Sequence, residues 1–122
     1  MSATSRLDDL AAISDGWLDG AGRAPTPHAI ATARGVLSAL AEHPDAPMPG
    51  LYPTPEGAVQ AEWHIGRVSA DLLFPAAPDA LTANALHVDT GAELDLTTSA
   101  DDPLAAARRI AAWLRALPSL AT

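Results

Sequence analysis

The spacing of apolar residues near the start of the chain predicts a first helix. Apolar side chains recur at helical intervals from Leu7 to Leu18, and the sequence DGAG at 19–22 interrupts them. Ser5 stands where an N-cap is expected, because its hydroxyl can accept from the first free backbone N–H groups. We therefore expect a helix that begins at Ser5, runs to Leu18 and is closed by Trp17.

A second helix is predicted between Thr26 and His43. Thr26 is a typical N-cap, and Pro27 suits the first turn because the N–H that it lacks would have no partner within the helix. The pair His43-Pro44 ends the pattern. The apolar stripe expected to face the core consists of Ile30, Ala33, Leu37 and Leu40.

Polar and apolar residues alternate between positions 59 and 74, which predicts two antiparallel strands. On the first strand, one face carries Gln60, Glu62 and His64, and the other carries Val59, Ala61 and Trp63. A two-residue turn at Ile65-Gly66 is expected because it matches every cross-strand pair in polarity. The expected polar pairs are His64 with Arg67, Glu62 with Ser69, and Gln60 with Asp71.

A second hairpin and a last helix follow. Residues 81–89 and 92–98 alternate about a turn at Thr90-Gly91, with Leu94 and Leu96 expected to point inward. The helix is predicted from Pro103 to just before Pro118. Its N-cap is either Asp101 or Asp102.

These elements define an α+β fold. Residues 44–58 are rich in proline and leave room only for a short edge strand around Leu51 and Tyr52. We predict two N-terminal helices, an antiparallel meander of about four strands and a C-terminal helix. The helices should pack on one face of the sheet, because an antiparallel sheet can leave its other face in water.

The composition narrows the classes of function. The chain has 122 residues, no cysteine and a formal net charge of −8, which favours one domain over residues 1–122 without disulfides or thiol chemistry. The acidic charge repels a phosphate backbone, so a basic or hydrophobic protein partner is expected and nucleic acid is not.

No targeting or cofactor signal is visible in the sequence. The first twenty residues lack a signal-peptide pattern, and no apolar run reaches the roughly 20 residues of a membrane helix. The sequence DGAG follows a helix rather than a strand, so it does not match a phosphate or dinucleotide loop. We expect a cytoplasmic bacterial protein with no membrane segment and no cofactor.

Two stretches together resemble a group of small, uncharacterised bacterial proteins. They read GWLDGAGRAPTPHAIATARGVL from residue 16 and YPTPEGAVQAEW from residue 52. The pattern of the group is W-x-D-G-x-G, a proline-capped helix, P-T-P-[DE]-G-G-[IV]-Q-x-E-W and an acidic hairpin, and it covers roughly residues 7–73. Members occur in short gene pairs with another small protein, which implies a protein partner. The group has no established activity, so the resemblance implies no catalytic residue.

This sequence departs from the pattern at two places. Ala58 replaces the second glycine, which relaxes any need for a left-handed backbone there, and the hairpin after Trp63 is shorter. The matching residues are Trp17, Asp19, Gly20, Gly22, Pro53, Thr54, Pro55, Glu56, Gly57, Gln60, Glu62 and Trp63.

The polar face of the first hairpin supplies the candidate surface. Its members are Glu56, Gln60, Glu62, His64, Arg67 and Asp71. A solvated sheet face is the first interpretation of such residues, and a protein-contact surface is the second. Acid–base chemistry or metal ligation comes third, since a carboxylate near a histidine can serve either.

A metal site is not predicted. The conceivable ligands are Glu62, His64, Asp71, His87 and Asp89, and they show no paired-histidine spacing. The leading hypothesis is a non-enzymatic protein-binding module with an antitoxin-like or immunity-like role beside the product of a neighbouring gene. The alternative is a small enzyme or ligand-binding protein that uses Gln60, Glu62 and His64. Trp17 and Trp63 are expected to be structural.

Overall fold

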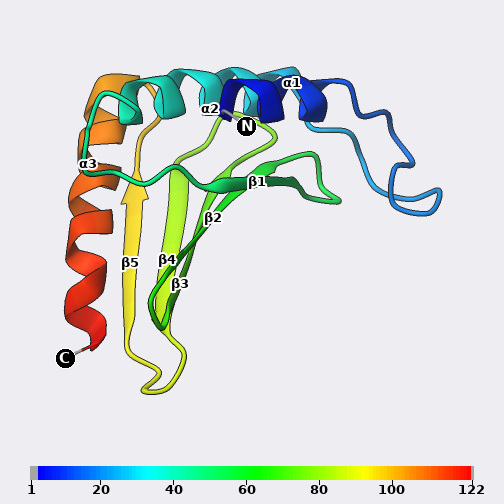
Figure 1. The fold of residues 1–122 in the computed structure, drawn as a ribbon. Coiled ribbons are helices and arrows are strands. Elements are labelled where there is room, and N and C mark those ends of the chain that lie inside the picture. Colours follow the sequence, from blue (N-terminus) through cyan, green and yellow to red (C-terminus); the bar gives the residue numbers. More distant parts are fainter. Residues whose placement is uncertain (1–2, 122) are drawn as a thin grey trace.

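The computed structural model describes residues 3–121 (Figure 1). Its elements in chain order are α1 (Ala3–Ala11), α2 (Pro27–Leu40), β1 (Gly50–Pro53), β2 (Val59–Ile65), β3 (Val68–Phe74), β4 (Leu81–His87), β5 (Glu93–Thr98), α3 (Pro103–Ala116) and the 3-10 helix η1 (Leu117–Ala121). The fold is α+β, as predicted. The sheet has five strands rather than about four because the short edge strand pairs with β2 along its whole length.

The sheet is an antiparallel meander in the order β1-β2-β3-β4-β5. In Figure 1, α1 and α2 lie across the upper ends of the strands, and α3 runs alongside β5. One face of the strands packs on the helices. No helix of the part of the chain that the structure describes covers the other face, which is called the open face below.

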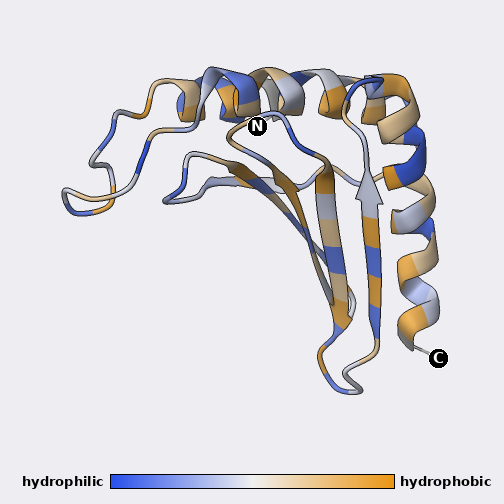
Figure 2. Ribbon diagram, turned by 180° about the vertical axis from the view of Figure 1, so that it is seen from behind, coloured by the Kyte–Doolittle hydropathy of each residue, from blue (hydrophilic) through white to orange (hydrophobic). Residues whose placement is uncertain are grey.

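The alternation of residues decides which face is buried. Along β2, Val59, Ala61 and Trp63 are buried while His64 is exposed. Figure 2 shows the same change between hydrophobic and hydrophilic residues along the neighbouring strands. Burying apolar surface is the main favourable term in folding. The helices therefore cover the face with the odd-numbered residues of β2, as the pattern predicts.

Trp63 and Trp113 form the bulky centre of a core that is otherwise rich in alanine. Trp63 is 3% exposed and meets Trp113 edge to face, with ring centroids 6.0 Å apart. The Nε1 atom of Trp63 donates to the carbonyl of Pro47 at 2.8 Å, so the buried indole N–H has a partner. Trp63 is structural, as predicted.

Each edge strand is tied to a helix. Arg6 Nε in α1 donates to the carbonyl of Leu51 in β1 at 2.8 Å. Trp113 Nε1 in α3 donates to the carbonyl of Leu94 in β5 at 3.0 Å. Because a bare edge strand offers its backbone to other chains, these bonds and the prolines near β1 protect the sheet from edge-to-edge pairing.

The prediction for the first helix is wrong beyond Ala11. Ser5 lies inside α1 rather than at its N-cap, and Trp17 lies in the following loop. No helix can run on to Leu18, because Gly16, Gly20 and Gly22 all have positive φ, as does Asp19. The Trp17 indole instead donates to the carbonyl of Arg23 at 2.8 Å and braces the loop.

This loop packs against the β1–β2 loop. The Arg23 N–H donates to the carbonyl of Pro55, and the Thr26 N–H donates to the carbonyl of Gly57, each at 2.9 Å. Gly57 has φ +88, and a Cβ there would lie 3.1 Å from the carbonyl oxygen of Ala24. The two stretches that carry the resemblance therefore meet in one structural unit.

The β2–β3 register is shifted by two residues from the predicted one. The turn residues are Gly66 and Arg67, and only Gly66 has positive φ, at +60. This matches a type II′ turn, in which glycine is favoured at the first position, whereas Ile65 suits a strand. The observed pairs are Gln60 with Leu73, Glu62 with Asp71, and His64 with Ser69. A shift of two keeps every side chain on its predicted face.

The two longer helices begin as predicted. Thr26 Oγ1 accepts from the Ala29 N–H at 3.1 Å, and Asp102 accepts from the Leu104 and Ala105 N–H groups at 3.1 and 3.2 Å. Among the helices described, none has both the length and the apolar character needed to span a membrane.

Candidate functional site

The open face is organised in three rows that cross the strands. The strand pairings place Tyr52, Gln60, Leu73, Thr82 and Thr97 in the first row. The second row, called the acidic row here, contains Glu62, Asp71, Asn84 and Asp95. The third contains His64, Ser69, Leu86 and Glu93. Three carboxylates thus share one row, and the fourth lies directly beside it.

Side-chain amides donate hydrogen bonds to most of these carboxylates. Asn84 Nδ2 donates to Asp95 Oδ1 at 2.5 Å and to Glu93 Oε1 at 3.3 Å. Gln60 Nε2 donates to Glu62 Oε1 at 3.2 Å. Asn84 and Gln60 therefore hold three acidic side chains in place on the exposed surface.

The carboxylate of Asp71 has no such amide donor among the described residues. No residue among those described donates a hydrogen bond to its carboxylate, and Glu62 stands directly opposite on the neighbouring strand. Partial desolvation and the negative charge of Glu62 raise the pKa of Asp71 above its ordinary value. Two carboxylates in direct cross-strand contact destabilise the sheet.

Asp71→Asn is expected to raise the free energy of unfolding by about 0.2–1 kcal/mol at pH 7, because it removes the repulsion from Glu62. The raised pKa means that the folded state binds the proton more tightly than the unfolded state. Wild type therefore gains stability as the pH falls through the folded pKa, and the advantage of the variant shrinks on acidification. Urea unfolding at several pH values measures both effects.

The matched control is Asp45→Asn. It also removes one negative charge, but from an exposed position in the loop between α2 and β1, where no strand pairing places a carboxylate opposite it. It should change stability by less than the Asp71 variant and with a smaller dependence on pH. Equal effects of the two variants would show that net charge, and not the Glu62 contact, is responsible.

Two neighbouring hollows of about 480 Å³ each lie along the first row and are together called the groove here. One is lined by the β1–β2 loop together with Gln60 and Leu73. The other shares Gln60 and Leu73 and extends to Asp71, Asn84, Asp95 and Thr97. Gln60 and Leu73 line both hollows, so the groove extends over the sheet from Pro53 in β1 to Thr97 in β5. A third hollow of about 380 Å³ lies beyond, between Thr97 and Arg109.

The structure brings some of the predicted surface residues together and places others apart. Gln60, Glu62 and Asp71 lie together on the open face, and Glu56 lines the groove from the adjoining loop. His64 lies one row away, with Ser69 Oγ at 3.5 Å from its Nδ1. The expected contact of His64 with Arg67 is therefore not made, because the register differs.

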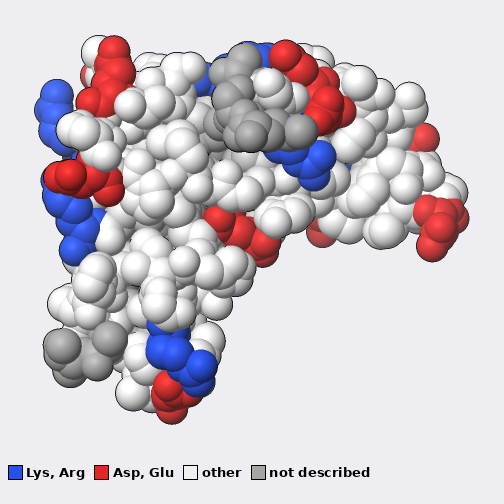
Figure 3. All heavy atoms as spheres, viewed as in Figure 1, with Lys and Arg blue, Asp and Glu red and all other residues white. Residues whose placement is uncertain are grey.

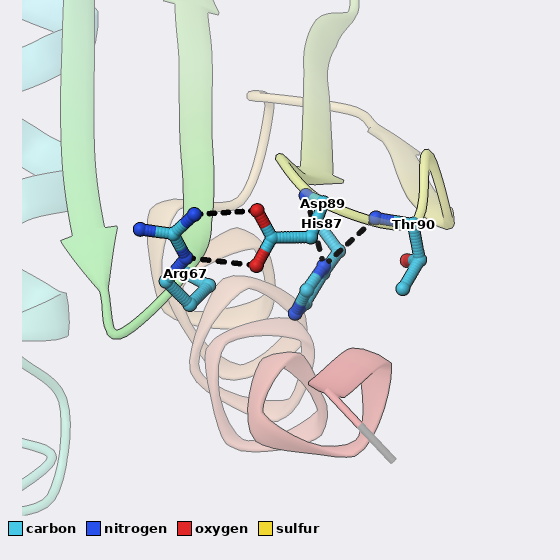
Figure 4. A network of polar contacts seen from close by, with 4 residues as sticks. All are labelled: Arg67, His87, Asp89 and Thr90. Atoms are coloured by element: carbon cyan, nitrogen blue, oxygen red, sulfur yellow. Dashed lines mark hydrogen bonds and ion pairs between the residues drawn. The ribbon is translucent and has the colours of Figure 1, made fainter.

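Arg67 lies in the β2–β3 turn and reaches the neighbouring hairpin. It forms two hydrogen bonds with the carboxylate of Asp89, and Figure 4 shows this ion pair beside His87. The hydrogen bond from Arg67 lowers the pKa of Asp89. His87 points to the buried face, and its Nδ1 accepts from the N–H groups of Asp89 and Thr90, each at 3.2 Å. This network joins the tips of the two hairpins.

The position of His87 separates it from the other conceivable metal ligands. It is buried on the helix side of the sheet, whereas Glu62, His64 and Asp71 lie on the open face. Within residues 3–121, no three His, Cys, Asp or Glu side chains are arranged to hold a metal ion.

Several residues of the open face were not predicted as part of the site. Tyr52 is 48% exposed and Leu86 is 36% exposed, so the face offers apolar area as well as charge. Asn84 and Asp95 come from β4 and β5 and complete the acidic row. The outward alternation of these strands was visible in the sequence, but their alignment with Glu62 depends on the strand registers.

The charge of the molecule is distributed unevenly. The five strands contain four carboxylates and no arginine, and lysine is absent from the chain. The carboxylates are Glu62, Asp71, Glu93 and Asp95. In Figure 3 basic atoms appear along the edge where α3 lies, at the lower tip of the molecule and beside acidic atoms near α1. The open face is therefore acidic, although arginines are exposed elsewhere.

Comparisons with known proteins add no relative. Searches of protein-family models, of curated proteins and of solved structures each find no significant match to this chain.

Proposed function

We propose that this chain is a protein-binding module that docks a basic partner protein on the open face of its sheet. The observation that carries the proposal is that this face bears four carboxylates and that no strand contributes an arginine or a lysine. Complementary charge speeds the encounter of two proteins and rejects partners of the wrong sign. An acidic sheet face is thus suited to select a positively charged surface.

The mixture of side chains on this face also suits a protein contact. Tyr52 and Leu86 are exposed apolar groups beside the carboxylates, and tyrosine is enriched at protein interfaces. The amides of Gln60 and Asn84 already hold Glu62 and Asp95. A face whose charged groups are held in position loses less side-chain entropy on binding.

The charge suggests a biological role. Proteins that act on nucleic acids carry basic surfaces, because they must neutralise phosphates. An acidic module can cover such a surface and block it. We therefore propose that the chain works in the bacterial cytoplasm with the product of a neighbouring gene, in an antitoxin-like or immunity-like role.

An enzyme or a small-ligand site on the same face has less support. Glu62 accepts from Gln60, and the side chain of His64 has Ser69 Oγ at 3.5 Å from its Nδ1, a distance too long for a strong hydrogen bond. A general base needs to be oriented by a close partner. His64 lacks that partner, and the carboxylate of Glu62 already accepts a hydrogen bond from Gln60.

Replacing Gln60 and Glu62 together with alanine should abolish or strongly weaken capture of the partner while leaving the fold intact. Both side chains are half-buried and contact each other on the surface, so the free energy of unfolding should change by only about 0.5 kcal/mol. Co-expression with the neighbouring gene followed by affinity capture measures binding, and thermal unfolding measures stability.

The control is the double variant Asp9→Ala with Ser38→Ala, which alters one acidic and one neutral polar side chain exposed on α1 and α2. It should capture the partner as wild type does. Undiminished capture by the Gln60 and Glu62 variant would contradict the proposal. A large loss of its stability would instead show that these side chains belong to the fold.

A further inference from the structure

The groove crosses the strands of the open face from β1 to β5. It follows the first row of the open face, and at its β1 end the β1–β2 loop bounds it on one side. The acidic row bounds it on the other side. Neighbouring strands lie about 4.8 Å apart, so the distance from β1 to β5 is about 19 Å, which an extended segment of about six residues spans.

The two long sides of the groove differ in chemistry. The first row is uncharged and includes the apolar side chains of Tyr52 and Leu73. The acidic row beside it places Glu62, Asp71 and Asp95 along one side. A segment lying in the groove would meet apolar and amide groups beneath it and carboxylates along one flank.

The same charges argue against two other occupants. A second copy of this chain seated face to face would bring four carboxylates against four, a repulsive arrangement. A nucleic acid would bring phosphates against them.

The width of the groove argues against a helix of the partner. A helix is about 10 Å wide, whereas the first row and the acidic row are only two residues apart along each strand, or about 7 Å, so an extended segment fits better.

We infer that the groove binds an extended segment of the partner protein whose arginine or lysine side chains pair with Asp71 and its neighbours in the acidic row. This inference rests on the proposed function and specifies its mode. Asp71 is the carboxylate expected to pair most readily with a cation, because no described residue donates a hydrogen bond to it and the negative charge of Glu62 repels it. A basic side chain placed between the two carboxylates relieves that repulsion.

The test uses a fluorescein-labelled nonapeptide of alternating arginine and leucine, and a second peptide with glutamate in place of arginine. The arginine peptide should bind wild type and the glutamate peptide should not, by fluorescence anisotropy at low salt. Glu62→Gln with Asp71→Asn should weaken binding about fivefold to tenfold. The control Asp9→Asn with Asp45→Asn removes the same two charges elsewhere and should change affinity less than twofold.

Backbone NMR locates the bound peptide. Amide shifts should change at Gln60, Leu73, Thr82 and Thr97, and the peptide should keep extended carbon shifts. Equal weakening by both double variants, shift changes confined to other surfaces, or a helical bound peptide would each overturn the inference. So would self-association of the chain that the peptide competes away, since the face would then belong to a second copy.

Different outcomes would contradict the proposed function and the inference about the groove. If the Gln60 and Glu62 variant loses the native partner but the arginine peptide does not bind wild type, the docking face stands and the extended basic segment is wrong. If the peptide binds in the groove but the native partner is captured regardless of Gln60 and Glu62, the proposed function is wrong at this face.

Discussion

Trp63→Ala is expected to lower the free energy of unfolding by about 3–5 kcal/mol, which is the usual cost of emptying a buried tryptophan site. The side chain is 3% exposed, and its ring packs edge to face on Trp113. The substitution also leaves the carbonyl of Pro47 without its indole donor. Small domains have only about 5–15 kcal/mol of stability, so urea unfolding should show a large shift of the midpoint.

Trp63→Phe separates the two contributions. It keeps an aromatic ring against Trp113 but removes the N–H donor, so it should cost clearly less than the alanine variant. An alanine variant that unfolds at the same urea concentration as wild type would contradict the buried position of Trp63. Equal losses for both variants would assign the effect to the hydrogen bond with Pro47.

The sequence predicted the faces of the sheet better than its pairs. Alternation fixes which side of a strand is apolar, so Trp63 and Glu62 were placed on the correct faces before any pairing was known. The register depends on which two residues form the turn. Because matched polarity is the same for shifts of two residues, that criterion could not separate Ile65-Gly66 from the observed Gly66-Arg67 turn. The conformational preference of glycine decides it.

The N-terminal loop shows the opposite failure. Apolar residues near Trp17 continue the helical spacing, yet α1 ends at Ala11. The apolar spacing continues into this loop, but Gly16 and Gly22 take backbone angles that a helix excludes. Glycines inside an apolar pattern were the available signal for an early end.

The candidate face was predicted in part. Gln60, Glu62 and Asp71 were identified from the alternation, and they do share the open face. Arg67 was assigned to the same face from the wrong register, and it instead pairs with Asp89. The contribution of β4 and β5 required knowing which of their residues align with Asp71, and this information lies in long-range pairing.

Gly57→Ala should destabilise the protein by about 2–5 kcal/mol. Gly57 has φ +88, a conformation that costs a residue with a Cβ about 1–2 kcal/mol. The added Cβ would also lie 3.1 Å from the backbone oxygen of Ala24, and a backbone atom cannot move aside as a flexible side chain can. Crowding of this kind typically costs about 1–3 kcal/mol more. Urea unfolding of the variant measures the sum.

Gly20→Ala is the matched control for this variant. Gly20 has φ +89, almost the same backbone angle, but an added Cβ meets no atom within 4 Å. It should therefore show only the conformational cost of about 1–2 kcal/mol, and the difference between the two variants reports the crowding at Ala24. Equal losses would mean that the loop beside Gly57 yields freely.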